Sequence, residues 1–153
     1  MSVFTIDRLG VDDVAVMREL LAVFAEVFED PETYLSRQPS DDYLRRLLAD
    51  PSFIALVARE GDHVAGGLAA YELRKFEQER SEVYIYDLGV RAAYRRRGIA
   101  TGLVRDLQGI AAGLGAWVIY VQADPPDAPA VALYESLGVR EEVYHYDIPV
   151  RPR

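Results

Sequence analysis

The sequence predicts an α/β (α+β) fold, with a mixed central sheet and helices on both of its faces. Two apolar segments joined by a short polar turn, residues 53–58 and 64–73, predict an antiparallel hairpin, which residues 82–90 extend to a meander. The helical spacing of residues 99–114 before the strand-like segment 116–121 predicts a β-α-β crossover with parallel strands. Half of the 153 residues are hydrophobic, which is enough for a sizeable core.

The elements before this region begin with an alternating segment, residues 3–8, that predicts a first strand. A helix is expected from Val11 to the residues just before Pro31, because its apolar residues repeat at helical spacing and proline cannot continue it. Ser40 suits the cap of a second helix over residues 41–50. The stretch between these helices shows no clear periodicity, so we expect either a solvated connector or a wall that faces the substrate.

The elements after the crossover begin with a helix in which Pro129 fits the first turn and which Gly138 ends. Residues 142–149 alternate and predict an edge strand. Inside the hairpin, Gly66 and Gly67 indicate a bulge or a close approach of another backbone. The predicted order is therefore β-α-α-β-β-β-α-β-α-β.

The composition limits the class of function. The formal net charge of −8 disfavours nucleic acid or an anionic membrane as a partner and favours a cationic ligand. The chain has no cysteine and two histidines, so we expect no disulfide, no thiol nucleophile and no metal site. The first residues lack a long apolar run, so we expect no signal peptide or membrane span and a cytoplasmic protein with one domain, residues 1–153.

A basic loop follows the predicted strand 82–90, at the start of the next helix. Backbone N–H groups in a first helical turn have no intrahelical partner and lie at the positive end of the helix dipole, so they suit an anion. A glycine in the loop lets a phosphate approach the backbone. We therefore interpret the loop as a pyrophosphate-binding site. Its members are Arg95, Arg96, Arg97, Gly98, Ile99, Ala100 and Thr101.

This loop, Arg95-x-x-Gly98-x-Ala100, resembles the acetyl-coenzyme A loop of the GNAT superfamily of N-acetyltransferases. A second stretch, residues 130–139, resembles the signature in which a tyrosine, here Tyr134, lies beside the coenzyme thiol. The resemblance covers nearly the whole chain. It implies the GNAT fold, whose sheet splays between two strands, here those ending near Val90 and Gln122, with the pantetheine in the gap.

The resemblance also implies acetyl-coenzyme A as the cofactor. The basic loop would hold its pyrophosphate, and the end of the strand before the loop would contact the pantetheine and the thioester. The residues at this strand end are Leu88, Gly89 and Val90.

Longer runs, among them residues 66–73, 84–88 and 118–124, resemble the aminoglycoside 3-N-acetyltransferases of GNAT type. In that family the carboxylate at the position of Asp87 lies near the amine that accepts the acetyl group. One departure is Asp127, which stands where many GNAT proteins have an asparagine near the coenzyme.

Acetyl transfer to an amine needs three groups: an acceptor for the ammonium proton, a donor to the carbonyl oxygen, and a proton for the thiolate. The candidates are Asp87, the backbone N–H of Leu88, and Tyr134. Asp87 is either a base or an electrostatic partner of the ammonium group, and both roles stay open. Ideal alternation puts it among core residues, unless a bulge near Gly89 redirects it.

The expected substrate is a cationic small molecule. Carboxylates and one tyrosine are candidates to bind it: Glu29, Asp30, Glu82, Tyr84, Asp124, Glu142 and Asp147. The predicted function is transfer of acetyl to the 3-amino group of an aminoglycoside, which confers antibiotic resistance. The alternatives are a GNAT enzyme that acetylates polyamines or another small cationic amine, and a non-catalytic acyl-coenzyme A binding module. A homodimer is left open.

Overall fold

The computed structural model describes residues 3–151 and divides the chain into two compact units. The first unit ends at Gln122 and the second begins at Ala123. The expectation of a single domain stays a prediction. No helix among the described residues combines the length and the apolar character that a membrane crossing needs.

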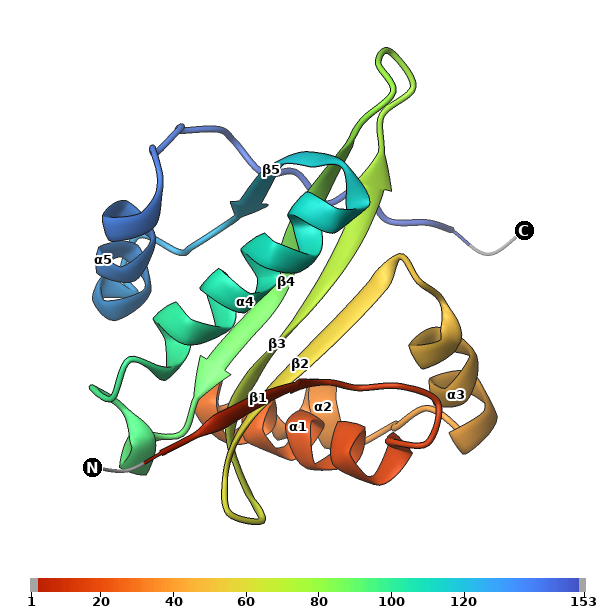
Figure 1. Ribbon diagram of the computed structural model, residues 1–153, viewed down its shortest axis with the longest axis vertical. Coiled ribbons are helices and arrows are strands. Elements are labelled where there is room, and N and C mark those ends of the chain that lie inside the picture. Colours follow the sequence, from red (N-terminus) through yellow and green to blue (C-terminus); the bar gives the residue numbers. More distant parts are fainter. Residues whose placement is uncertain (1–2, 152–153) are drawn as a thin grey trace. The chain divides into compact units, whose positions relative to one another are not determined.

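The first unit holds a sheet of five strands and most of the helices (Figure 1). Its strands follow in the order β1-β2-β3-β4-β5; neighbours are antiparallel up to β4, and β4 pairs with β5 in parallel. This arrangement confirms the predicted α/β class with a mixed sheet. The elements are β1 (Thr5–Arg8), α1 (Val14–Val27), α2 (Pro31–Leu35), α3 (Asp41–Ala49), β2 (Phe53–Glu60), β3 (His63–Arg74), β4 (Ser81–Val90), the 3-10 helix η1 (Ala92–Tyr94), α4 (Ile99–Leu114), β5 (Ala116–Val121) and, in the second unit, α5 (Ala128–Leu137).

Helices cover both faces of the sheet in the first unit (Figure 1). Apolar residues of α1 and α3, such as Phe24 and Leu44, form one core cluster with Ala55 and Val57 of β2. Because successive side chains of a strand point to opposite faces, Leu56 lies on the other face, which α4 covers. The inner strands β2 and β3 therefore have two buried faces over much of their length, which explains their nearly continuous apolar runs.

Two elements differ from the prediction. The stretch between α1 and α3 contains a short helix, α2, because Asp30 accepts a hydrogen bond from the backbone N–H of Thr33 and Pro31 occupies the first turn. Residues 142–149, predicted as an edge strand, contain neither helix nor strand. Alternation fits a strand, but a strand also needs a hydrogen-bonded neighbour, which the local sequence does not provide.

The glycine pair of β3, Gly66 and Gly67, lies where the backbones of neighbouring strands approach each other closely. The pairing of β2 with β3 shifts between Ala58 and Arg59, opposite Gly66, so a bulge is present there. A Cβ atom added to Gly66 would lie 2.6 Å from the carbonyl oxygen of Gly89 on β4. Both readings of the glycine pair, a bulge and a close backbone approach, are therefore confirmed.

Candidate active site

A β-bulge in β4 decides where the carboxylate of Asp87 points. In the pairing of β3 with β4, Ala69 lies opposite Asp87 but Ala70 lies opposite Ile85, so Tyr86 is an extra residue on β4. The extra residue moves Asp87 from the face of Ile85 to the face of Tyr86. The sequence left two alternatives open, a carboxylate among core residues or a bulge near Gly89, and the structure has a bulge three positions before Gly89. Asp87 consequently faces α1, α2 and α3 rather than the α4 side of the sheet.

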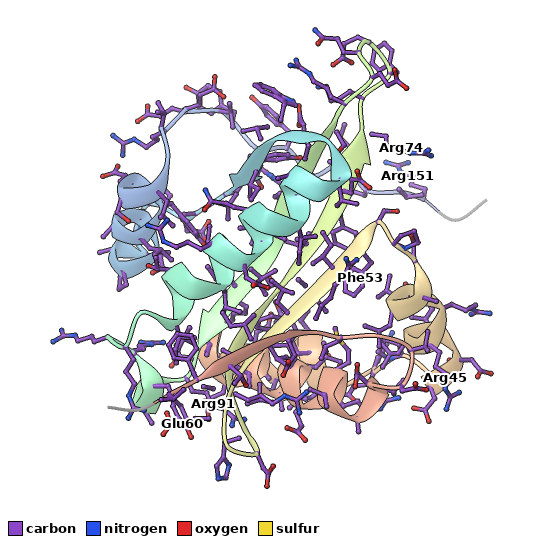
Figure 2. The ribbon with its side chains drawn as sticks, in the orientation of Figure 1. Arg45, Phe53, Glu60, Arg74, Arg91 and Arg151 are labelled. Atoms are coloured by element: carbon purple, nitrogen blue, oxygen red, sulfur yellow. The ribbon has the colours of Figure 1, made fainter. Side chains whose placement is uncertain are left out.

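On this face, Asp87 lies in a cleft of about 210 Å³, which we call the aromatic cleft. Tyr86 is 62% exposed and its ring meets that of Tyr71 edge-on, with 5.9 Å between the centroids. The residues that line the cleft are Met17, Leu21, Phe24, Pro39, Tyr43, Leu44, Leu47, Phe53, Ala69, Tyr71, Tyr86 and Asp87. Figure 2 labels one of them, Phe53, near the start of β2. Asp87 is thus the single carboxylate in a wall of apolar and aromatic side chains.

The surroundings of Asp87 change its acidity. Burial raises the pKa of the Asp87 carboxyl above its ordinary value, and a hydrogen bond from Tyr34 opposes that rise. The Tyr34 hydroxyl donates to Oδ2 of Asp87 at 3.0 Å. Among the described residues no lysine or arginine forms an ion pair with Asp87. A carboxyl in this setting takes up a proton more readily than an exposed one, as a general base near neutral pH must.

The sheet opens beside Asp87. Parallel pairing of β4 with β5 runs from Ser81 to Ile85 and does not extend to the last five residues of β4. The backbone N–H of Arg91, just after β4, donates to the carbonyl oxygen of Ala65 on β3. Because backbone N–H groups alternate in direction along a strand, the N–H of Gly89 also points toward β3. The N–H groups of Leu88 and Val90 therefore point to the opened side of β4, where they can meet a ligand.

The basic loop forms a second hollow, also of about 210 Å³, which we call the arginine pocket. Arg96 and Gly98 both have positive φ angles, 64° and 77°, so the chain turns sharply just before α4. No side chain caps α4, which leaves the N–H groups of its first turn available to an anion. The lining residues are Val90, Tyr94, Arg95, Arg96, Gly98, Ile99, Ala100 and Thr101.

Arg97, the third arginine of the predicted site, does not line the arginine pocket. Its guanidinium bonds Oε2 of Glu60 at 2.6 Å and lies over the ring of Tyr94. Figure 2 shows Glu60 at the end of β2, on the side of the molecule where β4 leads into the loop. Arg97 thus ties the loop to the β2–β3 hairpin.

The carboxylates of the first unit that were predicted to bind the substrate do not line the aromatic cleft. Asp30 caps α2, and its hydrogen bonds with Thr33 lower its pKa. Glu82 pairs with Lys75 at 2.8 Å, and Glu29 lies just after the C-terminal cap of α1, with a positive φ of 52°. Tyr84 stacks on Tyr120 and donates to Gln122 at 3.0 Å, next to the point where β4 and β5 separate.

The second unit holds the remaining predicted residues. Tyr134 lies on α5 and is partly buried. Asp127 caps α5 by accepting a hydrogen bond from Ala130, which accounts for its carboxylate without a coenzyme contact. Asp124 lies in the turn before α5, and Glu142 and Asp147 lie in the segment after it, where their partners are Arg140 and His145.

The sequence did not single out Tyr34, Tyr43 and Tyr71 as site residues. Tyr34 reaches Asp87 only because α2 turns it back toward the sheet. The sequence Asp30-Pro31, a cap followed by proline, was the available signal for that helix. No group of three or more His, Asp or Glu side chains within residues 3–151 is arranged to hold a metal ion.

Solved structures with the same fold include acetyltransferases. An aminoglycoside acetyltransferase, HMB0005, from an uncultured soil metagenomic sample is 56% identical, with a TM-score of 0.96 over 97% of this chain and 99% of that one. A second, meta-AAC0020, also from an uncultured soil metagenomic sample and in complex with sisomicin, is 29% identical, with a TM-score of 0.90 over 97% of both chains.

A curated relative, the mycothiol acetyltransferase of Clavibacter michiganensis subsp. michiganensis (strain NCPPB 382), is 36% identical over 109 residues. The match covers 70% of this chain and only 33% of that protein. The model of the Acetyltransferase (GNAT) family matches residues 15–139, which include β4, the arginine pocket and α5. The fold, the opened strand and this match together assign the chain to the GNAT family of acetyltransferases.

Proposed function

We propose that this protein transfers an acetyl group from acetyl-coenzyme A to an amino group of an aminoglycoside. The main observation behind the proposal is the set of groups that one strand, β4, presents along its last residues. Within four residues, β4 presents the Asp87 carboxylate to the aromatic cleft and the N–H groups of Leu88 and Val90 to the opened edge. It then leads through η1 to the arginine pocket. Acceptor, thioester and diphosphate would then bind along one continuous piece of chain.

The arginine pocket fits the diphosphate of coenzyme A. Arg95 and Arg96 supply guanidinium groups, and the first turn of α4 supplies N–H donors at the positive end of its dipole. A side chain at Gly98 would meet no protein atom within 4 Å, so the space over this residue is open to a ligand. When bound, the coenzyme would supply an acetyl group activated as a thioester.

Asp87 and Leu88 would act at the reacting atoms. Asp87 holds the acceptor amine and accepts its proton as the amine attacks the thioester carbonyl directly. The Leu88 N–H donates to the carbonyl oxygen as that oxygen gains negative charge. The C–S bond breaks, and the products are the N-acetylated amine and coenzyme A.

Tyr134 would return a proton to the departing thiolate. A phenol with a pKa near 10 is a suitable donor to a thiolate at neutral pH. This role rests on the match of residues 130–139 to the family signature around that tyrosine. It is tested separately with Tyr134→Phe, for which we expect lower turnover and unchanged coenzyme affinity.

The aromatic cleft favours an aminoglycoside over a linear polyamine. Tyr43, Tyr71 and Tyr86 offer ring faces and edges to the C–H faces and ammonium groups of saturated, substituted rings, and Asp87 is one anchor for one amine. A polyamine would be better served by several carboxylates in a row, and the cleft contains only one. The relatives named as aminoglycoside acetyltransferases support the same substrate class. The 3-amino group is proposed as the acceptor from the resemblance of the longer sequence runs.

The test is a thiol-release assay with acetyl-coenzyme A and a panel of aminoglycosides, polyamines and short peptides. We expect release with aminoglycosides, and NMR of the product should locate the acetyl group on the 3-amino nitrogen. Asp87→Asn should lower turnover strongly and leave coenzyme affinity unchanged. Release confined to polyamines or peptides would overturn the substrate class, and coenzyme binding without any release would indicate a binding module.

Antibiotic resistance would follow from this activity. Expression in a susceptible bacterial host should raise the inhibitory concentration of the aminoglycosides that are acetylated in vitro. Expression of Asp87→Asn at the same level should leave the host susceptible.

A further inference from the structure

We infer that Tyr34 is a positioning residue for Asp87. Its hydroxyl holds Oδ2 of the carboxylate at 3.0 Å and leaves Oδ1 for the acceptor amine. This inference rests on the proposed function, because it assigns Tyr34 a part in orienting the group that receives the amine. Tyr34 acts through Asp87 and does not itself react.

The position of Tyr34 is fixed without help from Asp87. Its ring centroid lies 5.9 Å from that of Phe24 and 5.9 Å from that of Phe28, and Phe24 is buried in the core. The Asp30 cap and Pro31 set the start of α2, and Gln38 donates to the Tyr34 carbonyl at 3.3 Å. The hydroxyl is therefore held in place before a substrate arrives, as preorganised catalysis requires.

The hydrogen bond has two effects on Asp87. It fixes the rotation of the carboxylate, which otherwise has apolar and aromatic neighbours. It also favours the ionised form, against the burial that raises the pKa of Asp87. Without Tyr34, the carboxylate would be free to turn and would hold a proton to higher pH. Both changes would lower the population that is ready to receive an amine.

The other ionisable groups near Asp87 do not replace this hydrogen bond. Those in the cleft are tyrosines, Tyr43 of α3, Tyr71 of β3 and Tyr86 of β4, and α1 contributes only apolar side chains to it. Tyr84 of β4 is coupled electrostatically to Asp87, and Asp30 lies near Tyr34. Burial and the Asp87 charge raise the pKa of Tyr34 further above its ordinary value, so the phenol keeps its proton and remains a donor.

The test substitutes Tyr34 with phenylalanine, which keeps the ring packing on Phe24 and Phe28 and removes the hydroxyl. We expect kcat/KM for the aminoglycoside to fall about tenfold or more, because hydrogen bonds to charged groups are worth about that factor. The acidic limb of the pH profile of kcat/KM should move to higher pH, because the hydrogen bond that lowers the pKa of Asp87 is lost. Tyr120→Phe, which removes the hydroxyl of a partly buried tyrosine on β5, is the matched control and should change neither quantity.

A double-mutant cycle separates positioning from a general structural role. If Tyr34 acts through Asp87, Tyr34→Phe should have little further effect in the Asp87→Asn background. Additive losses in the double variant would overturn the inference. So would a Tyr34→Phe enzyme whose pH profile matches the wild type while its melting temperature falls, since that result would assign Tyr34 to the fold alone.

A measurement that does not depend on catalysis tests the contact of Tyr34 with Asp87 separately from the proposed function. Carbon-13 NMR of the Asp87 side-chain carboxyl should give a higher pKa in Tyr34→Phe than in the wild type. If no aminoglycoside is acetylated but this difference is present, the proposed function fails and the contact of Tyr34 with Asp87 stands. If the wild type is active and the two pKa values are equal, the inference fails and the proposed function stands.

Discussion

Asp87 is a single residue whose environment favours its neutral form, while its proposed role needs the carboxylate. Its folded-state pKa is raised by burial above the ordinary 3.8, so the folded protein binds this proton more tightly than the unfolded chain does. The stabilisation from the proton is complete below that ordinary value and is lost as the pH rises through the raised one. At neutral pH, Asp87 therefore destabilises the fold at the position of its proposed role.

The raised pKa of Asp87 predicts how removal of its charge changes the stability of the fold. Asp87→Asn keeps an acceptor for Tyr34 and removes the charge, so its melting temperature at pH 7 should exceed that of the wild type, on the order of 2 °C. At about pH 3, where Asp87 is itself protonated, the two proteins should melt together. Thermal unfolding monitored by circular dichroism over this pH range checks it. A variant that is less stable at pH 7 would show that the Tyr34 contact outweighs the burial.

Gly67 shows how one residue limits the packing of α1 on the sheet. A Cβ atom added there would lie 2.5 Å from Cδ1 of Leu20 on α1 and 2.5 Å from the carbonyl oxygen of Leu56 on β2. The Leu20 side chain is fully buried and could move only by displacing other core side chains. The backbone carbonyl of a central strand cannot move away. The position therefore requires glycine.

We predict that Gly67→Ala lowers the free energy of unfolding by about 1–3 kcal/mol, as overpacked cores do. Gly109→Ala is the control, since Gly109 is exposed on α4 and an added Cβ meets nothing within 4 Å. That change should raise stability by about 0.5–1 kcal/mol, because alanine favours a helix. Urea unfolding of both variants measures the difference. Equal stabilities would contradict the packing argument.

At the scale of elements, the loop between β4 and α4 divides its arginines between two tasks. Arg95 and Arg96 line the arginine pocket, while Arg97 pairs with Glu60 and so fastens the loop to the hairpin of β2 and β3. The three residues are adjacent in sequence and identical in type. Only the path of the backbone, with its left-handed turns at Arg96 and Gly98, separates their directions.

This division predicts unequal effects on coenzyme binding. Arg96→Ala should weaken the binding of coenzyme A by about tenfold, because it would remove the charge-assisted contact to phosphate that we propose. Arg97→Ala should weaken it less, and Glu60→Gln should reproduce the smaller effect, since both only release the loop. Isothermal titration with coenzyme A gives the three dissociation constants. A loss for Arg97→Ala as large as that for Arg96→Ala would mean that Arg97 leaves Glu60 to bind the ligand.

At the scale of the whole molecule, the charge distribution suits a polycation as the acceptor. Both parts of the chain carry more acidic than basic residues, and the net charge is −8. In the described structure, the ionised groups near the aromatic cleft are few, so the attraction arises mainly from the long-range field. Such attraction is screened by salt, whereas the proposed contact of an amine with the partly buried Asp87 would be screened much less.

We predict that KM for an aminoglycoside rises several-fold, about three- to tenfold, between about 20 mM and 500 mM NaCl, with kcat nearly unchanged. A small monoamine, used as the control acceptor, should show a weaker dependence because it carries fewer charges. Steady-state kinetics at saturating acetyl-coenzyme A tests both. A salt dependence that is equal for the two acceptors would mean that the field of the whole molecule does not recruit the substrate.

Much of the fold could be predicted because its signals are local. The apolar runs of β2 and β3, the helical spacing of α4 and the Ser40 cap each depend on neighbours in the chain. The basic loop was predicted as an anion site for the same reason, since its donors lie in one turn of backbone and Gly98 marks the turn, but the direction of Arg97 was not foreseen. Residues 142–149 were predicted wrongly as a strand, since pairing depends on a distant neighbour.

By itself, the sequence determined the mixed α/β class, the order of β2 to α5, the arginine-rich start of α4 and the family motif around it. The tertiary structure alone decided that Tyr86 bulges out of β4, which face Asp87 therefore occupies, and that Tyr34 meets it from 53 residues away. Helical spacing and capping are properties of adjacent residues and can be read along the chain. A bulge and a long-range hydrogen bond depend on how separate elements pack, and that is settled only when the chain has folded.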